Sequence, residues 1–371
     1  MKKLALLLAF MFIVFSSFSQ NQDKQENIKE DKKEGHLQIT FAYPVGIHGI
    51  NSMNYRNKVS VNILFGINGG FDGIEFGSIG NYNTGDVKGM QFAGVLNVNQ
   101  KKAEGFIIGG TGNIILGKAK GFVLSSSVNF TKDTLDGFQL STVNIGNYVK
   151  GMQLGTVNMV KEVDGFQLGV VNLAQKVKGV QMGVVNFGNK TKGAQIGIVN
   201  IAPKGEGVTP VGLINVVKGG LYELEVSGSE ALYSNISFKM GVERFYSVFT
   251  ASFGAYNGKF VHSTGFGFGG NIKLAEKHSL DIFGTANQII YDGNFEGELN
   301  LLNKFNINYK YRLNKGFSLF AGPTLNVYVS KEKVDGRLGT INIPYSIYKH
   351  ESKNTLVSIW SGLNLGVSYR F

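Results

Sequence analysis

Gly151-Met-Gln-Leu-Gly-Thr-Val-Asn158 is followed by Gly165-Phe-Gln-Leu-Gly-Val-Val-Asn172, Gly179-Val-Gln-Met-Gly-Val-Val-Asn186 and Gly193-Ala-Gln-Ile-Gly-Ile-Val-Asn200. Looser copies extend this phrase in both directions. The first glycines of ten units are spaced by 16 residues and then by 14, at Gly73, Gly89, Gly105, Gly121, Gly137, Gly151, Gly165, Gly179, Gly193 and Gly207. A fixed period of this length indicates a repeat architecture.

A 14- or 16-residue unit is too short to form a hairpin whose strands cross a bilayer. The period favours a β-solenoid, in which each unit is one coil and equivalent residues stack about 4.8 Å apart. Asparagine would occupy a corner, where it tolerates the left-handed conformation. The repeated glutamines and asparagines would form two stacked amide columns, interpreted as structural ladders rather than a ligand-gripping surface. The competing architecture is a meander of short hairpins.

The N-terminus has the pattern of a secretory signal peptide. Lys2 and Lys3 precede an apolar run of 12 residues from Leu4 to Phe15, and a small-x-small pattern follows at Ser17-Phe18-Ser19. This run is shorter than the roughly 20 residues of a membrane-spanning helix, so we expect an exported chain. The sequence contains no cysteine, which excludes disulfides, a thiolate metal site and a lipidated N-terminal cysteine.

The charge does not indicate nucleic acid as a partner. The formal net charge of +11 becomes +9 without Lys2 and Lys3, and the lysines are scattered at one or two per repeat. Nucleic-acid binding needs a clustered basic footprint. We therefore interpret these lysines as solvated turn residues, with attraction to anionic envelope lipid or polysaccharide as the weaker alternative.

Beyond Leu221 the repeat gives way to long segments that alternate apolar and polar residues, the period of a two-faced strand. Phe305, Ile307 and Tyr309 share one face, and Asn306 and Asn308 share the other. Eight strands are expected near residues 221–228, 232–242, 245–256, 260–272, 278–291, 301–313, 316–330 and 356–371. The Asn257-Gly258 dipeptide predicts a tight hairpin.

These strands predict an antiparallel β-barrel of about 8–12 strands, with apolar residues toward lipid and polar residues toward the lumen. Tyrosines crowd this half of the chain, as in interfacial girdles. The C-terminal Phe371, behind Tyr369 and Val367, resembles the signal read by the outer-membrane barrel assembly machinery. The alternative is a soluble β-sandwich or barrel, whose strands also alternate.

The expected organisation is therefore all-β. It comprises a signal peptide (1–19), a polar leader (20–35), N-terminal strands (36–68), the repeat domain (69–218) and the C-terminal barrel (219–371). The pattern leaves open whether the strands of residues 36–68 join the barrel.

Residues able to carry chemistry are few. His36, His48, His262, His278 and His350 lack metal-ligand spacing, and Gly265-Phe-Gly-Phe-Gly-Gly270 lacks the lysine and helix of a phosphate loop. Two carboxylate pairs, Glu223 with Glu225 and Glu296 with Glu298, are read as lumen or solvent charge rather than acid–base groups. His262 with Ser263 is the only cue for a hydrolase, and it lacks an oxyanion element. We expect no catalytic residue, no cofactor and no metal site.

The Gly-x-Gln-x-Gly-x-x-Asn units, from about Gly66 to Val217, resemble an uncharacterised family of bacterial surface-repeat envelope proteins. The resemblance implies an envelope location in a Gram-negative-type bacterium and no established activity. Among the first four units only Gln91 occupies the glutamine position, which puts a continuous glutamine column in doubt there.

The sequence thus predicts a non-enzymatic outer-membrane or cell-surface protein, whose barrel anchors a repeat domain with a structural or adhesive role. Its expected partners are outer-membrane lipid, the assembly machinery and a surface glycan or protein, not nucleic acid. The alternative function is a small outer-membrane channel or lipid-handling barrel, with the repeats as plug or cap.

Overall fold

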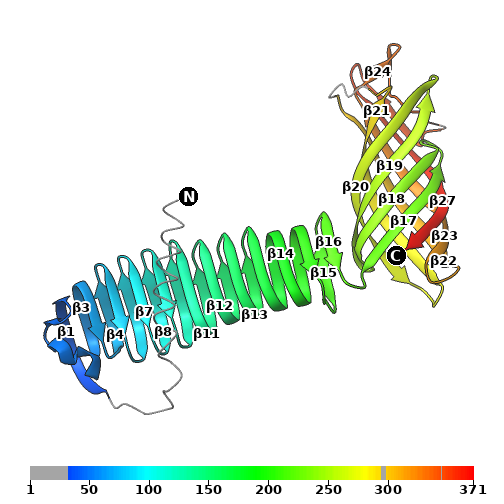
Figure 1. Cartoon of the computed structure of the whole chain (residues 1–371). Helices are drawn as coiled ribbons and strands as arrows, with labels where there is room; N and C mark the ends of the chain where they lie inside the picture. The colour runs from blue at the N-terminus through cyan, green and yellow to red at the C-terminus, as the bar shows by residue number, and fades with distance from the viewer. Residues whose placement is uncertain (1–31, 294–297, 344) are drawn as a thin grey trace.

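The computed structural model describes residues 32–293, 298–343 and 345–371 (Figure 1). The predicted signal peptide, residues 20–31 of the predicted leader, and Glu296 lie outside these ranges. Within them, no helix has the length and apolar character needed to cross a bilayer. The chain forms a long parallel β-solenoid followed by an antiparallel β-barrel (Figure 1).

The solenoid has about 15 residues per coil over residues 57–217. Its elements are β1 (Lys33–Ala42), β2 (Val45–Gly46), the 3-10 helix η1 (Gly49–Asn54), β3 (Tyr55–Asn68), β4 (Phe71–Gly77), β5 (Gly80–Asn83), β6 (Val87–Ala93), β7 (Leu96–Asn99), β8 (Ala103–Gly109), β9 (Gly112–Ile115), β10 (Ala119–Ser125), β11 (Val128–Leu140), β12 (Val143–Leu154), β13 (Val157–Leu168), β14 (Val171–Ala202), β15 (Val208–Val211) and β16 (Ile214–Val217). Coils pair with their neighbours in parallel, which excludes the antiparallel meander.

Both amide columns lie inside the solenoid and are fully buried. Asn158 Nδ2 donates to Asn172 Oδ1 at 2.9 Å and also to the carbonyl oxygen of Leu168 at 2.9 Å, and most repeat asparagines make this pair of bonds. Gln167 Nε2 donates to Gln153 Oε1 at 2.9 Å, so the glutamine ladder donates toward the N-terminus. The interpretation of the amides as structural ladders is confirmed, because buried amides cannot grip a ligand.

The position predicted for the asparagines was wrong in one respect. Asn158 is the second residue of β13, past the corner at Gly155-Thr156, and among the described residues the only non-glycine residues with positive φ are Asn257, Asp292 and Asp335. The asparagine therefore serves through its side chain, which satisfies a carbonyl of the next coil, and not through a left-handed backbone.

The change of period from 16 to 14 is shared between two corners, whereas a single shortened corner would have been the simpler expectation. Val128 pairs with Val143, an offset of 15, whereas Leu140 pairs with Leu154, an offset of 14. Each corner of the coil therefore loses one residue. The last predicted unit also differs, because Gly193 pairs with Val208 and Gly207 lies outside the glycine column.

The N-terminal strands belong to the solenoid and not to the barrel. Strand β1 runs parallel to β3, with Leu37 beside Val59, and β2 and η1 complete this end. Because β1 starts at Lys33, the strand begins inside the segment predicted as an unstructured leader.

The barrel has eight strands, within the predicted range, and their positions confirm the alternation pattern. They are β17 (Leu221–Ser229), β18 (Ser234–Val242), β19 (Phe245–Tyr256), β20 (Lys259–Lys273), β21 (His278–Tyr291), β22 (Asn300–Arg312), β23 (Phe317–Ser330) and β27 (Leu356–Arg370). Strand β17 pairs with β27 and closes the barrel. Asn257 and Gly258, both at positive φ, form the predicted tight turn. Three short strands lie between β23 and β27: β24 (Lys333–Val334), β25 (Arg337–Leu338) and β26 (Tyr348–Glu351).

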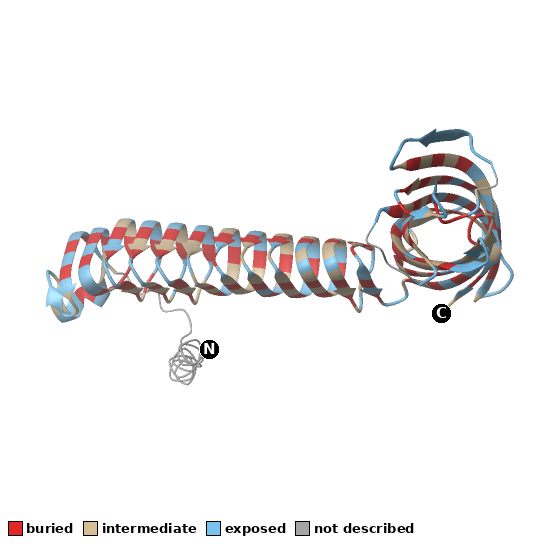
Figure 2. Ribbon diagram, turned by 90° about the horizontal axis from the view of Figure 1, so that it is seen from above, coloured by how far each residue is buried: buried red, intermediate tan, exposed pale blue. Residues whose placement is uncertain are grey.

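The last solenoid coil packs against the outer wall of the barrel at β18 and β19. Asn215 Nδ2, at the end of the asparagine ladder, donates to Ser247 Oγ at 2.8 Å, and Ser247 Oγ donates to the carbonyl oxygen of Gly212. Val242 packs on the small cluster that contains Val217. Figure 2 looks nearly along the barrel and shows the solenoid meeting it from the side.

Candidate functional site

One corner of the solenoid carries almost all of its charge. The residue before each stacked glycine alternates in sign from coil to coil, in the order Asp72, Lys88, Glu104, Lys120, Asp136, Lys150, Asp164 and Lys178. Coils about 4.8 Å apart place each charge beside an opposite one. Lys178 Nζ, for example, lies 2.9 Å from Asp164 Oδ2, and this hydrogen bond raises the pKa of Lys178.

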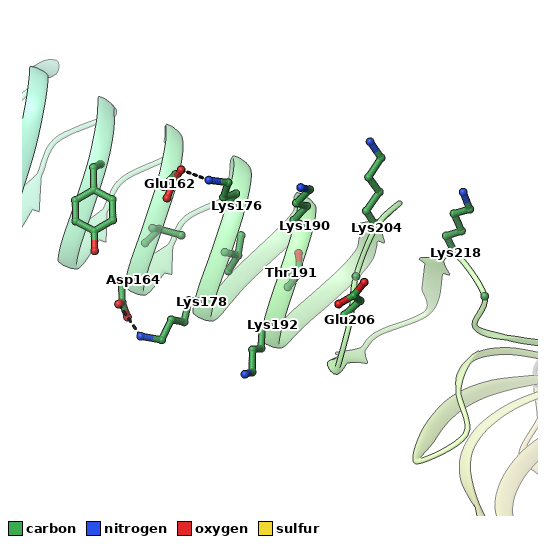
Figure 3. Close-up of a pocket in the computed structure, with 15 residues that line it drawn as sticks. Glu162, Asp164, Lys176, Lys178, Lys190, Thr191, Lys192, Lys204, Glu206 and Lys218 are labelled. Carbon is green, nitrogen blue, oxygen red and sulfur yellow. Dashed lines mark hydrogen bonds and ion pairs between the residues drawn. The ribbon is translucent and has the colours of Figure 1, made fainter.

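The alternation fails next to the barrel. Lys192 follows Lys178 after 14 residues, and Gly193 stacks on Gly179, so two lysines are neighbours in this column. The adjacent column runs Tyr148, Glu162, Lys176, Lys190, Lys204 and Lys218 (Figure 3). The repeat therefore brings together lysines that are far apart in the sequence.

These lysines line an open hollow of about 990 Å³, the largest found over the described residues. Its lining contains six lysines and three carboxylates, Glu162, Asp164 and Glu206. Lys176 pairs with Glu162 and Lys178 with Asp164, whereas the ion pairs of the described chain include none of Lys190, Lys192, Lys204 and Lys218 (Figure 3). We call the six lysines of this hollow, Lys176, Lys178, Lys190, Lys192, Lys204 and Lys218, the lysine corner.

The lysine corner corrects the prediction that the lysines are scattered. A period of 14 residues stacks residue i on residue i+14, so one lysine per repeat becomes a continuous patch. The patch suits an extended anion, because like charges in adjacent coils repel unless a counter-charge lies between them. Its one hydroxyl, that of Thr191, is buried and donates to the carbonyl oxygen of Gly188, which leaves binding rather than catalysis as its chemistry.

The carboxylate pair Glu223 and Glu225 lies inside the barrel in a buried charge network. Lys239 Nζ lies 2.7 Å from Glu225 Oε1, and Lys310 Nζ lies 2.9 Å from the same atom. Lys239 and Lys310 also bind Asp281, the second at 3.5 Å. Because every carboxylate has an ammonium partner, the network joins four strands across the lumen and holds the barrel together.

The lumen is filled along its length. Glu230 accepts hydrogen bonds from Trp360 Nε1 at 2.8 Å and Asn326 Nδ2 at 3.0 Å near the end opposite the charge network. The hollows that the described residues leave among the inward-facing side chains measure about 20 Å³ each. Such spaces hold about one water molecule, as expected when eight strands enclose only side chains.

The hydrolase cue at His262 and Ser263 is wrong. Neighbouring residues of a strand point to opposite faces, and Ser263 is buried inside the barrel while the His262 ring stacks on Phe260 at 5.5 Å. His48 stacks on Tyr55, and His278 lies beside Tyr309 and Tyr311 at the other end of the chain. Gly265 to Gly270 lie within strand β20, as predicted.

Comparison of the chain with protein-family models, with curated proteins and with solved structures found no match. The combination of a solenoid of about 11 turns and an eight-stranded barrel therefore rests on the structure alone.

Proposed function

We propose that the barrel spans an outer membrane and anchors the solenoid there. The observation that carries this proposal is the inverted pattern of its wall: on β22, Phe305 and Ile307 are exposed on the outside, while Asn306 and Asn308 are buried in the lumen. A water-soluble barrel would have the opposite arrangement. A closed barrel with an apolar outer surface satisfies every backbone group in lipid.

The lengths of the strands fit this placement. Strands β19 to β23 and β27 have 12 to 15 residues, and a tilted strand needs about 9–11 to cross the hydrocarbon layer. The aromatic side chains of Phe317, Tyr369 and Phe371 pack together on the outer wall near one rim. Phe371 stays the proposed contact of the assembly machinery.

The connections between strands favour the periplasmic side for the solenoid. At the end where the solenoid joins, Glu243-Arg244 links β18 to β19, and residues 313–316 link β22 to β23. At the other end, residues 331–355 separate β23 from β27. Outer-membrane barrels have short periplasmic turns and long extracellular loops.

The channel alternative has little support in the structure. The solenoid lies against the outer wall and so neither plugs nor caps the lumen (Figures 1 and 2). The charge network and the residues around Glu230 fill the lumen of the described barrel.

The role proposed for the solenoid is adhesive and not enzymatic. Its lysine corner would bind an anionic glycan of the envelope, so that the barrel ties this polymer to the membrane. The stacked cations repeat at the coil spacing and suit a chain with regularly spaced acidic groups. The resemblance to surface-repeat envelope proteins is in keeping with this location.

Binding to a carboxylated polysaccharide tests the adhesive role. The full chain in detergent micelles should bind polygalacturonate in a salt-dependent manner and should not bind neutral dextran. The double variant Lys190→Glu/Lys204→Glu should lose at least about tenfold in affinity. The matched control, Lys101→Glu/Lys118→Glu, makes the same change of net charge in distant coils and should bind as the native chain does. Equal binding by both variants would refute the lysine corner as the site.

Fractionation tests the anchor. The expressed chain should sediment with outer membranes of a Gram-negative host and migrate differently on a gel before and after boiling. A soluble periplasmic protein that shows no such shift would contradict a membrane-spanning barrel.

A further inference from the structure

The edge of the solenoid opposite the lysine corner has no charge. We call it the apolar edge, and its ten stacked residues are Ile79, Val95, Thr111, Ser127, Thr142, Thr156, Val170, Val184, Ile198 and Leu213. The four next to the barrel are all large and exposed, from 38% at Leu213 to 48% at Val170 and Ile198. Leu168 and Met182 extend this exposed surface on the neighbouring face. The solenoid is therefore amphipathic around its circumference, with charge on one edge and apolar side chains on the other.

Contacts with the barrel fix the direction of the two edges. Val217, one residue before the lysine corner at Lys218, packs near Val242, which adjoins the turn at the barrel end. Gly212, beside the apolar edge, accepts a hydrogen bond from Ser247, which lies further along β19 from that turn. The lysine corner thus lies level with the end of the barrel, and the apolar edge lies further up its wall.

That height coincides with the beginning of the apolar outer wall. Beyond Ser247, the outward residues of β19 include Phe249 and the exposed Phe253, and β18 contributes the exposed Ile236. The solenoid axis crosses the barrel axis in both views (Figures 1 and 2). A barrel that spans the membrane would therefore hold the solenoid along the membrane plane, with the apolar edge toward the lipid.

We infer that the apolar edge is a lipid-binding surface that lies at the boundary between headgroups and acyl chains of the periplasmic leaflet. The inference rests on the proposed function, because it needs the barrel in the membrane. Exposed apolar patches that run on over several coils mark interaction surfaces, and an amphipathic element with a charged opposite face lies in the interface plane. Lipid is the occupant that the geometry favours, since the edge continues the lipid-facing wall of the barrel. The lysine corner then faces away from the bilayer and stays free to bind its polymer.

Single cysteines test this surface, because the native chain has none. The full chain carrying Val184→Cys, Lys190→Cys or Leu325→Cys would be labelled with the fluorophore NBD and reconstituted in phosphatidylcholine vesicles. Some of the lipids would carry a nitroxide quencher near the headgroup. Val184 lies on the apolar edge, Lys190 on the lysine corner of the adjacent coil, and Leu325 on the outer barrel wall.

The account predicts at least about twofold quenching at Leu325 and Val184 and little at Lys190, since contact quenching needs the probe within the bilayer. Quenching at Leu325 with none at Val184 would overturn the lipid contact and leave the anchor intact. Fluorescence at Val184 that is blue-shifted and unquenched would indicate a second copy on this edge, which also overturns the inference. Absence of quenching at Leu325 would refute the membrane barrel itself.

Discussion

The stacked glycines are the residues that the solenoid tolerates least to change. Gly179 has φ of +129°, and a Cβ atom there would lie 2.0 Å from the carbonyl oxygen of Gly165 in the preceding coil. The same conflict recurs along the column. Glycine is thus required both by backbone conformation and by the close approach of one coil to the next.

Gly179→Ala should therefore destabilise the solenoid by about 3 kcal/mol, since backbone strain alone costs about 1–3 kcal/mol and the steric overlap adds to it. Thermal unfolding of the full chain in micelles measures the loss. The control is Gly207→Ala, because Gly207 has φ of +72° but no atom near its absent Cβ. It should cost about 1 kcal/mol. Equal losses in the two variants would contradict the stacking argument.

Glu75 is a buried carboxylate at a position where later coils have glutamine. It pairs in register with Gln91 and accepts hydrogen bonds from Asn68 at 2.6 Å, Asn83 at 2.7 Å and Gln91 at 2.8 Å. Burial raises the pKa of Glu75 above its ordinary value of 4.5, although these hydrogen bonds act in the opposite direction. The unfolded chain therefore loses this proton at a lower pH than the folded chain does.

From this sign, the solenoid should lose stability as pH rises from 4.5 through the raised pKa of Glu75. Melting temperatures at about pH 5 and about pH 8 measure this slope, and Glu75→Gln should flatten it. The control is Glu104→Gln: Lys102 lowers the pKa of Glu104, so its titration lies below this window. An unchanged slope in Glu75→Gln would show that another group is responsible.

At the scale of the element, the two amide ladders differ in how much they stabilise. The glutamine column is interrupted at Ile107 and Val123, which pair in register with Gln91 and Gln139 and pack in the apolar core. The asparagine column is continuous from Asn81 to Asn215. Each asparagine also satisfies a backbone carbonyl of the next coil, which the glutamines largely do not.

Asn172→Leu should thus cost more than Gln167→Leu, by about 1–2 kcal/mol. The first leaves the carbonyl oxygen of Met182 and the Oδ1 of Asn186 without their donors, and the second breaks only the ladder. Chemical denaturation of the two variants under the same conditions measures the difference. A larger cost for Gln167→Leu would mean that the glutamine ladder is the stronger one.

The elements were predictable where a period controls them. Alternation placed all eight barrel strands because one face must hold residues such as Asn308 and the other Ile307. The glycine period gave the coils, but it misplaced Gly207, since a repeat cannot show an insertion that leaves its motif almost intact. The lysine corner was missed because stacking depends on distance across coils. Comparing Lys178 with Lys192 at the period of 14 would have shown the break in alternation.

At the scale of the whole molecule, the sequence left the N-terminal strands and the membrane side undecided. Strand β1 alternates like a barrel strand, but it pairs with β3 in parallel, a choice that local pattern cannot express. The side of the membrane depends on which barrel end carries the long connection at residues 331–355, and this required the closed topology. The proposed molecule is a transmembrane barrel with an amphipathic solenoid along the periplasmic leaflet.

The measurement that tests this most directly is labelling of single cysteines in intact cells with a membrane-impermeant maleimide. Lys353→Cys lies in the long connection, and Lys190→Cys lies on the lysine corner. The account predicts that Lys353→Cys reacts in intact cells and that Lys190→Cys reacts only after the outer membrane is permeabilised. Reaction of Lys190→Cys in intact cells, with Lys353→Cys protected, would contradict the proposed orientation of the protein.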